Sequence, residues 1–347
     1  MPVHAIDKPI GPTSHDLVAR ARRALGTRRV GHAGTLDPLA SGVLLLLSGD
    51  ATKLSPWLTG SDKAYLAWVA FGADTPTWDA EGPIARRGDP AGLHAEAIER
   101  EARVFLAVRE QVPPRFSAIK RGGVASYEAA RRNLGHEDDG DEAAAMPPRA
   151  AGYRSVRLLA FGPRDRLPDR FGPGPAGWEP QPGGRALPLP PALTALPTAL
   201  FALEVAAGTY VLAFARDLGE ALGVPAHLAG LVRTRAGGVP LERTVPPDAV
   251  ADAPGLTEAD ALPLPKRTLD QEQARRVRNG QRLPVGTVEG DAGSDAGSNS
   301  GSDVGSDVGS DAGPVGLVDA AGRMVAIAEL APSGMRLLRV WPADDAA

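Results

Sequence analysis

The chain has 347 residues, of which 43% are hydrophobic, contains no cysteine and carries a formal net charge of −4. A single hydrophobic core seldom serves more than about 250–300 residues, so this length predicts two domains. The lack of cysteine excludes disulfides and thiolate metal sites, and the sequence has no apolar run of about 18 residues and no basic leader followed by an apolar stretch. We therefore expect a cytoplasmic protein without a membrane-spanning segment.

Two acidic segments account for the negative charge. Residues 137–142 (EDDGDE) and residues 290–313 each contain five acidic residues and no basic one, so the rest of the chain carries +6. A mildly basic body is compatible with a nucleic-acid ligand. Basic residues concentrate at Arg20, Arg22, Arg23, Arg28 and Arg29, and again at Arg275, Arg276, Arg278 and Arg282. Each cluster is open to two interpretations, a phosphate contact or a solvated helix face.

The first 50 residues place one carboxylate in a rigid turn. Residues 3–25 predict an apolar strand, a Pro/Gly turn and a short helix with N-cap residues at its start. Asp37 follows a glycine-rich stretch and precedes Pro38, and residues 44–47 predict a buried strand. Asp37 then lies at the edge of an element, facing a cleft, where it either caps the turn or serves as a nucleophile. A phosphate-binding loop is disfavoured, because the Lys-Ser/Thr pair of a P-loop and the spacing of a dinucleotide fingerprint are both missing.

The middle of the chain intermixes strands and helices. Strands are predicted at residues 65–71, 153–161 and 199–205, and amphipathic helices at residues 93–105 and 124–133. Because they do not alternate regularly, we expect an α+β fold with a mixed, mainly antiparallel sheet.

Several connecting segments are interpreted separately. Residues 135–146 and the proline-rich residues 162–197 are interpreted as insertions, the second as a plain surface loop. Residues 217–222 predict a helix after a strand that ends in GTY, and Pro225 predicts the start of another helix, which carries His227.

The C-terminal part predicts a small second domain. Residues 249–265 form a linker, and residues 256–342 combine a basic helix at 270–279, ended by Gly280, with short strands at 314–330 and 337–341. Residues 290–313 repeat a Gly-Ser-Asp-Ala/Val unit with no large side chains to bury, so we expect a disordered hairpin insertion. A calcium-binding Gly-Asp repeat is disfavoured, because such repeats need a large apolar residue in each unit.

Five segments resemble one family in the right order. They are IDKPIGPTSHDLV (6–18), GHAGTLDPLASGVL (31–44), KAYLAWVAFGADTPTWDAEG (63–82), PPRFSAIKRGGVASYEAARR (113–132) and GTYVLAFARDLGEALGVPAHLAGLVRTRAG (208–237). Together they resemble the TruB-type tRNA pseudouridine synthases. The resemblance implies a catalytic pseudouridine synthase domain at 1–246 and, more weakly, a PUA-like RNA-binding domain at 256–342. We also expect no cofactor, no metal and no required protein partner, and nothing in the sequence demands more than a monomer.

The resemblance assigns roles to particular residues. Asp37 would be the nucleophile, Tyr65 would stack on the target base and could also move a proton, Tyr210 would line the pocket, and Leu231 would contact the substrate. His32 would help to hold the displaced nucleotide, and the arginines from Arg20 to Arg29 would contact phosphates. The implied substrate is uridine 55 in the T-loop of tRNA. On local sequence alone, each tyrosine also fits a core position and His32 fits a loop.

The implied reaction breaks the C1′–N1 bond of uridine, turns the uracil and rejoins it through C5. A carboxylate suits this reaction because it can attack the sugar at C1′ or the base at C6 and then leave again, and a glycal route stays open as well. One departure stands out, because Leu212 replaces the arginine that follows GTY-Ile in the family pattern. Either Arg216, Arg233 or Arg235 replaces that cation, or the protein binds and folds tRNA without catalysis. A subunit of an RNA-guided complex is a third, disfavoured alternative.

Overall fold

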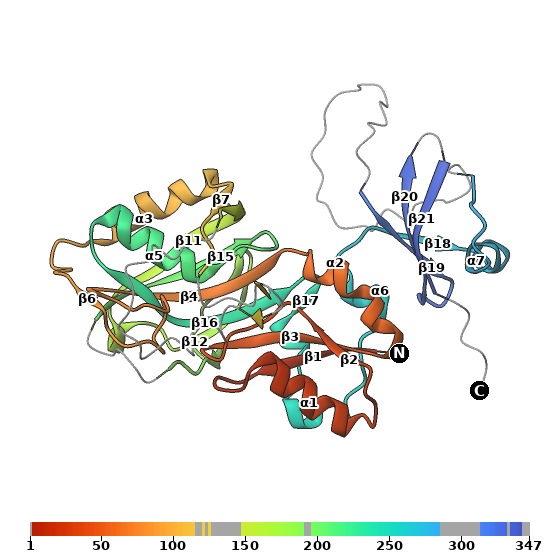
Figure 1. The fold of residues 1–347 in the computed structure, drawn as a ribbon, viewed down its shortest axis with the longest axis horizontal. Helices are drawn as coiled ribbons and strands as arrows, with labels where there is room; N and C mark the ends of the chain where they lie inside the picture. The colour runs from red at the N-terminus through yellow and green to blue at the C-terminus, as the bar shows by residue number, and fades with distance from the viewer. Residues whose placement is uncertain are drawn as a thin grey trace. The chain divides into compact units, whose positions relative to one another are not determined.

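The computed structural model describes residues 2–114, 120–121, 124–125, 147–190, 196–284, 313–331 and 334–341. The chain divides into two compact units, one of residues 4–254 and one of residues 255–347 together with residues 1–3 (Figure 1). The acidic segments at 137–142 and 290–312 lie outside the described residues, as does most of the helix predicted at 124–133. Val124 and Ala125 form a short strand instead.

The larger unit is built on an eight-stranded sheet. Its central order is β1-β3-β16-β4-β15-β11, with β2 beside β3 and β17 beside β16. The strands are β1 (Val3–Lys8), β2 (Val30–Ala33), β3 (Ala40–Ser48), β4 (Lys63–Phe71), β11 (Tyr153–Pro163), β15 (Pro197–Val205), β16 (Ala226–Ala236) and β17 (Val239–Pro240). β16 runs parallel to β3 but antiparallel to β4, and the pairs β4–β15, β15–β11 and β2–β3 are antiparallel. The predicted α+β fold with a mixed, mainly antiparallel sheet is confirmed.

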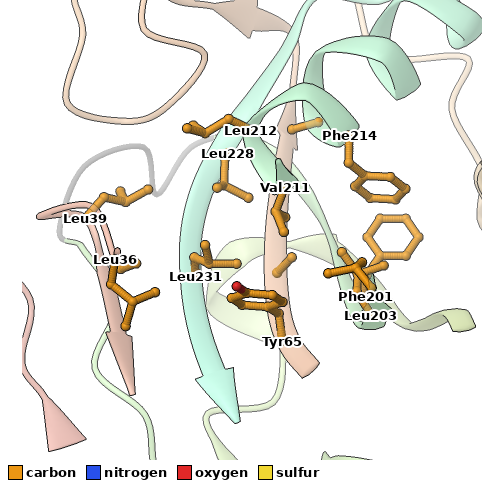
Figure 2. Packing of buried hydrophobic residues seen from close by; sticks show 14 of the residues in the cluster. Leu36, Leu39, Tyr65, Phe201, Leu203, Val211, Leu212, Phe214, Leu228 and Leu231 are labelled. Carbon is orange, nitrogen blue, oxygen red and sulfur yellow. The ribbon is translucent and has the colours of Figure 1, made fainter. Parts of the chain in front are cut away.

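Three helices pack with one face of this sheet in a single hydrophobic core. They are α1 (Ser14–Ala24), α3 (Ala95–Val104) and α5 (Val211–Leu222). α1 begins at a capping box between Thr13 and Asp16, as the predicted N-cap residues require. Figure 2 shows part of this core, where Val211 lies next to Tyr65 of β4, and Phe214 lies next to Phe201. The odd-numbered residues of β4 from Tyr65 to Phe71 all belong to this core, so the even-numbered ones face the other side of the sheet.

That other side is covered by the proline-rich segment. The segment forms a small sheet of β12 (Arg170–Gly174), β13 (Gly177–Pro180) and β14 (Arg185–Ala186). Phe171 is fully buried and meets Trp68 of β4 edge to face, with ring centroids 5.7 Å apart. The prediction of a plain surface loop at 162–197 is therefore wrong, because its aromatic residues cover a sheet face that would otherwise expose Trp68.

Two sequence-based boundaries near the C-terminal end of this unit also need correction. α5 begins at Val211, six residues before the predicted start, and it ends at Gly223, which has a left-handed φ of 68°. Pro225 starts no helix, because residues 226–236 form β16, paired with β3 on one edge and β4 on the other. A strand buried on both faces lacks the alternation of polar and apolar residues that identifies strands in a sequence.

The remaining elements of the larger unit are short. They are α2 (Ser55–Thr59), β5 (Ala73–Asp74), β6 (Arg86–Arg87), β7 (Glu110–Gln111), β8 (Lys120–Arg121), β9 (Val124–Ala125) and β10 (Arg149–Ala150). β7 pairs with β10, which places Gln111 next to the start of α5.

The smaller unit is a four-stranded sheet with one longer helix. Its strands lie in the order β18 (Lys266–Leu269), β19 (Val315–Asp319), β20 (Met324–Ala331) and β21 (Gly334–Val340). A short helix α6 (Glu258–Ala261) precedes them, and α7 (Gln271–Arg278) is capped by Asp270 and packs Val277 into the core. Within the described residues of both units, no helix is long and apolar enough to span a membrane.

Candidate active site

Asp37 sits in a tight turn between β2 and β3. The carbonyl of Asp37 accepts a hydrogen bond from the Ala40 N–H at 3.0 Å, which closes the turn. Ser14 of α1 fastens the preceding residue, because its hydroxyl accepts from the Leu36 N–H at 2.9 Å and donates to the Leu36 carbonyl at 3.0 Å. The turn is thus held by its own backbone and by the first helix. These bonds fix the position of the Asp37 backbone, from which its side chain extends.

Glycine is required at one neighbouring position. Gly42 has a φ of 97°, and a Cβ atom added there would lie 2.3 Å from the backbone oxygen of Arg233. A side chain at this position would therefore push β3 away from β16. The close approach of these two strands brings Arg233 beside the Asp37 turn.

Two buried, positively charged side chains donate hydrogen bonds to backbone carbonyls in and next to this turn. Arg233 is 1% exposed, and its guanidinium donates to the carbonyls of Val43 at 2.7 Å, Gly34 at 3.0 Å and Thr35 at 3.3 Å. Lys8 is also fully buried, and its Nζ donates to the Ala40 carbonyl at 2.6 Å. Neutral carbonyls satisfy the donors of both side chains without cancelling their charge, so both cations act on the Asp37 carboxylate through space.

The pKa of Asp37 is raised to about 6. Desolvation by the surrounding protein is the largest cause, and the negative charge of Asp79 raises the pKa further, while Lys8 and Arg233 lower it. The side chain is enclosed on most sides yet keeps partial access to solvent through the pocket. Desolvation also lowers the pKa of Lys8 to about 8. Asp37 is therefore a carboxylate that gains and loses its proton close to neutral pH.

A pocket of about 250 Å³ brings several predicted residues together. Asp37, Tyr65, Tyr210 and Leu231 all line it, and so do Leu212, Lys63 and Arg233. In Figure 2 the Tyr65 ring and Leu231 lie side by side across β4 and β16. Leu212 contributes an apolar wall at the second residue of α5, where the family pattern has a cation.

Gln111 fixes the position of Tyr210. Tyr210 N–H donates to Gln111 Oε1, and Gln111 Nε2 donates to the Tyr210 carbonyl at 3.3 Å and to the Tyr153 hydroxyl at 3.2 Å. Since Tyr210 precedes the first residue of α5, these bonds also hold the beginning of that helix. Sequence reasoning missed Gln111, because residues that cooperate across 99 positions leave no local pattern.

His32 lies on β2 and does not line the pocket. Its ring meets the ring of His15 edge to face, with centroids 5.3 Å apart. The pKa of His32 is lowered to about 4, mainly by burial and to a smaller extent by the positive charges of His15 and Arg233. His32 is therefore an uncharged ring at neutral pH, next to the Asp37 turn rather than inside the pocket.

The arginines from Arg20 to Arg29 are exposed on and after α1. Arg22 donates to the Val30 carbonyl at 2.9 Å and Arg29 pairs with Asp50 at 2.9 Å, so part of the cluster also fastens the chain leading into β2. Arg20, Arg23 and Arg28 present their side chains to solvent.

Of the three arginines considered as replacements, one reaches the site. Arg216 pairs with Asp217 and stacks over the Trp78 ring at 4.0 Å, and Arg235 pairs with Glu204. Arg233 lines the pocket and contacts the Asp37 turn. Within the ranges that the structure describes, no three His, Cys, Asp or Glu side chains gather to hold a metal ion.

Comparisons with known proteins identify the family. Residues 22–145 match the family model described as TruB family pseudouridylate synthase (N terminal domain). A tRNA pseudouridine synthase B from Thermus thermophilus is 46% identical over 342 residues, which cover 98% of this chain and 99% of that protein. One from Deinococcus deserti is 45% identical over 291 residues, which cover 84% of this chain and 91% of that protein.

A solved structure shares the fold at lower identity. A chain in the crystal structure of a Cbf5-Nop10-Gar1 complex superposes with a TM-score of 0.62 and 21% identity, covering 99% of this chain and 86% of that chain.

Proposed function

Since the chain belongs to the TruB family of pseudouridylate synthases, we propose that it converts uridine to pseudouridine in tRNA, at uridine 55 of the T-loop. Its relatives in Thermus and Deinococcus carry the name tRNA pseudouridine synthase B. The observation that carries the proposal is the enclosed carboxylate of Asp37 in one pocket with Tyr65, Tyr210 and Leu231.

Asp37 acts as the nucleophile in this proposal. Attack on C1′, addition to C6 and the glycal route all use the charged carboxylate, and with a pKa of about 6 most of it is charged at pH 7. The turn that holds Asp37 is pinned by Ser14 and Arg233, so the carboxylate loses little freedom when substrate arrives. No external cofactor is needed, because the reaction moves a bond within one nucleotide.

The target base must leave the RNA stack to reach Asp37, which costs a few kcal/mol. The aromatic ring of Tyr65 offers a stacking surface inside the pocket, and Leu231 forms an apolar wall beside it. His32 then occupies the space that the base leaves, and its position outside the pocket lining suits that role. The exposed Arg20, Arg23 and Arg28 contact phosphates of the same RNA.

Arg233, assisted by Lys8, supplies the positive charge that Leu212 does not. Both residues lower the pKa of Asp37 and both are anchored by carbonyls of the Asp37 turn or of β3. A catalytically silent tRNA-binding protein is the alternative that Leu212 raises, and the assay below separates the two.

The smaller unit serves as a PUA-like RNA-binding domain in this proposal. Arg275 and Arg282 are exposed on and after α7, and Arg275 also pairs with Glu272. Arg276 is half-buried and donates to Gln281, and Arg278 pairs with the buried Asp319, so both have structural roles. We place the protein in the cytoplasm as a monomer that needs no protein partner.

The test measures tritium release from T-loop RNA labelled at uridine C5. Asp37→Asn is nearly isosteric but a far weaker nucleophile, so turnover should disappear while the Kd for tRNA stays within about tenfold, a change below roughly 1.4 kcal/mol. Asp252→Asn, at an exposed aspartate, is the matched control and should keep full activity. Turnover in a clean Asp37→Asn preparation would refute the assignment, and a wild type that binds tRNA but releases no tritium would favour the silent alternative.

A further inference from the structure

A second pocket lies on the face of the sheet opposite the Asp37 site. Its floor consists of residues on neighbouring strands that alternate with those of the active face, and its wall is the β12–β13 hairpin of the proline-rich segment. The floor residues are Ala64, Ser155, Arg157, Ala202, Glu204 and Arg235. Tyr65 and Leu203, which belong to the core of the other face, also border it, so Tyr65 lines both pockets. The pocket measures about 410 Å³, which falls within the range of about 300–1,000 Å³ typical of sites for small organic ligands.

The charged groups in this pocket favour an anion. Arg157 and Arg235 contribute two positive charges and Glu204, paired with Arg235, contributes one negative charge, so the lining carries +1. Arg157 donates to the Ala176 carbonyl at 3.0 Å, which ties the hairpin to the sheet without neutralising its guanidinium. The hydroxyls of Ser155 and Thr234 add groups that both donate and accept hydrogen bonds.

Two donors in the lining are buried and have no hydrogen-bond partner. They are Arg157 Nε and the indole Nε1 of Trp178, a residue that is 7% exposed. A buried donor left unpaired costs about 1–3 kcal/mol, so an acceptor at this place would recover stability. Trp178 also borders a neighbouring cavity of about 280 Å³, so its unpaired N–H could face either space. Arg157 lines only the pocket of about 410 Å³, and we therefore expect the ligand's acceptor atom there.

We propose that this pocket binds a phosphate ester about the size of a mononucleotide. Phosphate oxygens are acceptors that form charge-assisted hydrogen bonds with a guanidinium and with an indole N–H. The volume exceeds what an inorganic anion fills, and Glu204 with the two hydroxyls can bind the donors of a ribose or a base. The same chemistry is available from a free nucleotide and from a phosphate of bound tRNA, and the proposal is independent of the reaction at Asp37.

The test uses the full-length protein and two binding measurements. In the first, AMP is titrated calorimetrically, and in the second, tRNA is titrated by filter retention at fixed salt. Trp178→Phe removes the N–H and keeps an aromatic ring, Arg157→Met removes the charge, and Ser155→Asp adds a negative charge without touching the Arg157–Ala176 bond. Arg154→Met is the matched control, because Arg154 is an exposed arginine on the same strand and does not line the pocket.

We expect AMP or tRNA affinity to fall at least about fivefold in all three pocket variants and to change less than twofold in Arg154→Met. A fall in the AMP measurement assigns the pocket to a free nucleotide, and a fall in the tRNA measurement alone assigns it to a phosphate of the RNA. If neither affinity falls in Trp178→Phe and Ser155→Asp, or if Arg154→Met weakens binding equally, the proposal is wrong. Melting curves of each variant exclude unfolding as the cause of a loss, and Ser155→Asp keeps the test decisive if Arg157→Met fails to fold.

Discussion

Replacing Leu212 with arginine tests the electrostatics of the site directly. Leu212 and Asp37 line the same pocket, so a guanidinium at position 212 would face the carboxylate. An opposite charge within about 4–6 Å lowers the pKa of a carboxyl by roughly 1–3 units, which would move Asp37 from about 6 to between about 3 and 5. If the charged form of Asp37 reacts, as we propose, activity rises as pH increases through this pKa, and the substitution shifts that rise to lower pH.

The size of the effect depends on the pH at which it is measured. With a pKa of about 6, roughly a tenth of Asp37 is charged at pH 5, whereas with a pKa of about 5 or below at least half is charged. We therefore expect kcat/KM at pH 5 to rise at least about fivefold in Leu212→Arg, and kcat/KM at pH 8 to change little.

The assay is tritium release across pH 4.5–8.5, a range of about four units around the pKa, with kcat/KM reporting the free enzyme. Leu212→Met is the control, because it keeps the size and apolar character of the side chain and should leave the acid limb unchanged. An acid limb that stays near pH 6 in a folded Leu212→Arg protein would refute the reasoning, and so would an equal shift in Leu212→Met.

Three further substitutions test other parts of the structure. Asp79→Asn removes the like charge that raises the pKa of Asp37 and keeps an acceptor for Thr77 and for the Glu81 N–H, so the acid limb should move down by up to about one unit; an unmoved limb would contradict this. Arg233→Lys keeps a charge but loses the planar fork that binds three carbonyls, so tritium release should fall at least about tenfold, whereas Arg235→Lys, on the same strand, should retain most activity. Phe171→Ala should cost about 3–5 kcal/mol in urea unfolding, and a cost below about 1 kcal/mol would mean that the proline-rich segment does not stabilise the sheet.

The sequence predicted the Asp37 turn well, but it could not show which of the candidate arginines lies beside Asp37. Gly34, Pro38 and the apolar run after them act locally, so the turn and β3 follow from neighbouring residues. Arg233 and Arg235 are two positions apart and would point to the same face of a regular strand. A register shift between them, seen in the pairing with β4, turns Arg233 toward Asp37 and Arg235 toward Glu204. Such a bulge depends on the partner strand and leaves no trace in single-sequence periodicity.

The proline-rich segment and β16 were misjudged for opposite reasons. In the first, ten prolines concealed Phe171 and Trp178, whose burial depends on a sheet face far away in the sequence. In the second, an alanine- and leucine-rich stretch resembled a helix because both of its faces are covered. Tertiary burial overrides local propensity in each case.

The three carbonyl bonds of Arg233 join residues that are 190 to 199 positions apart. At a synthesis rate of about 5–20 residues per second, a growing chain carries Asp37 for roughly 10–40 s before Arg233 is made. During that interval β3 lacks its parallel neighbour β16, and the turn lacks the hydrogen bonds from Arg233 to Gly34 and Thr35. The surroundings of Asp37 are therefore completed late in translation, so an unfinished chain carries helix α1 and Asp37 before Arg233 is present beside them.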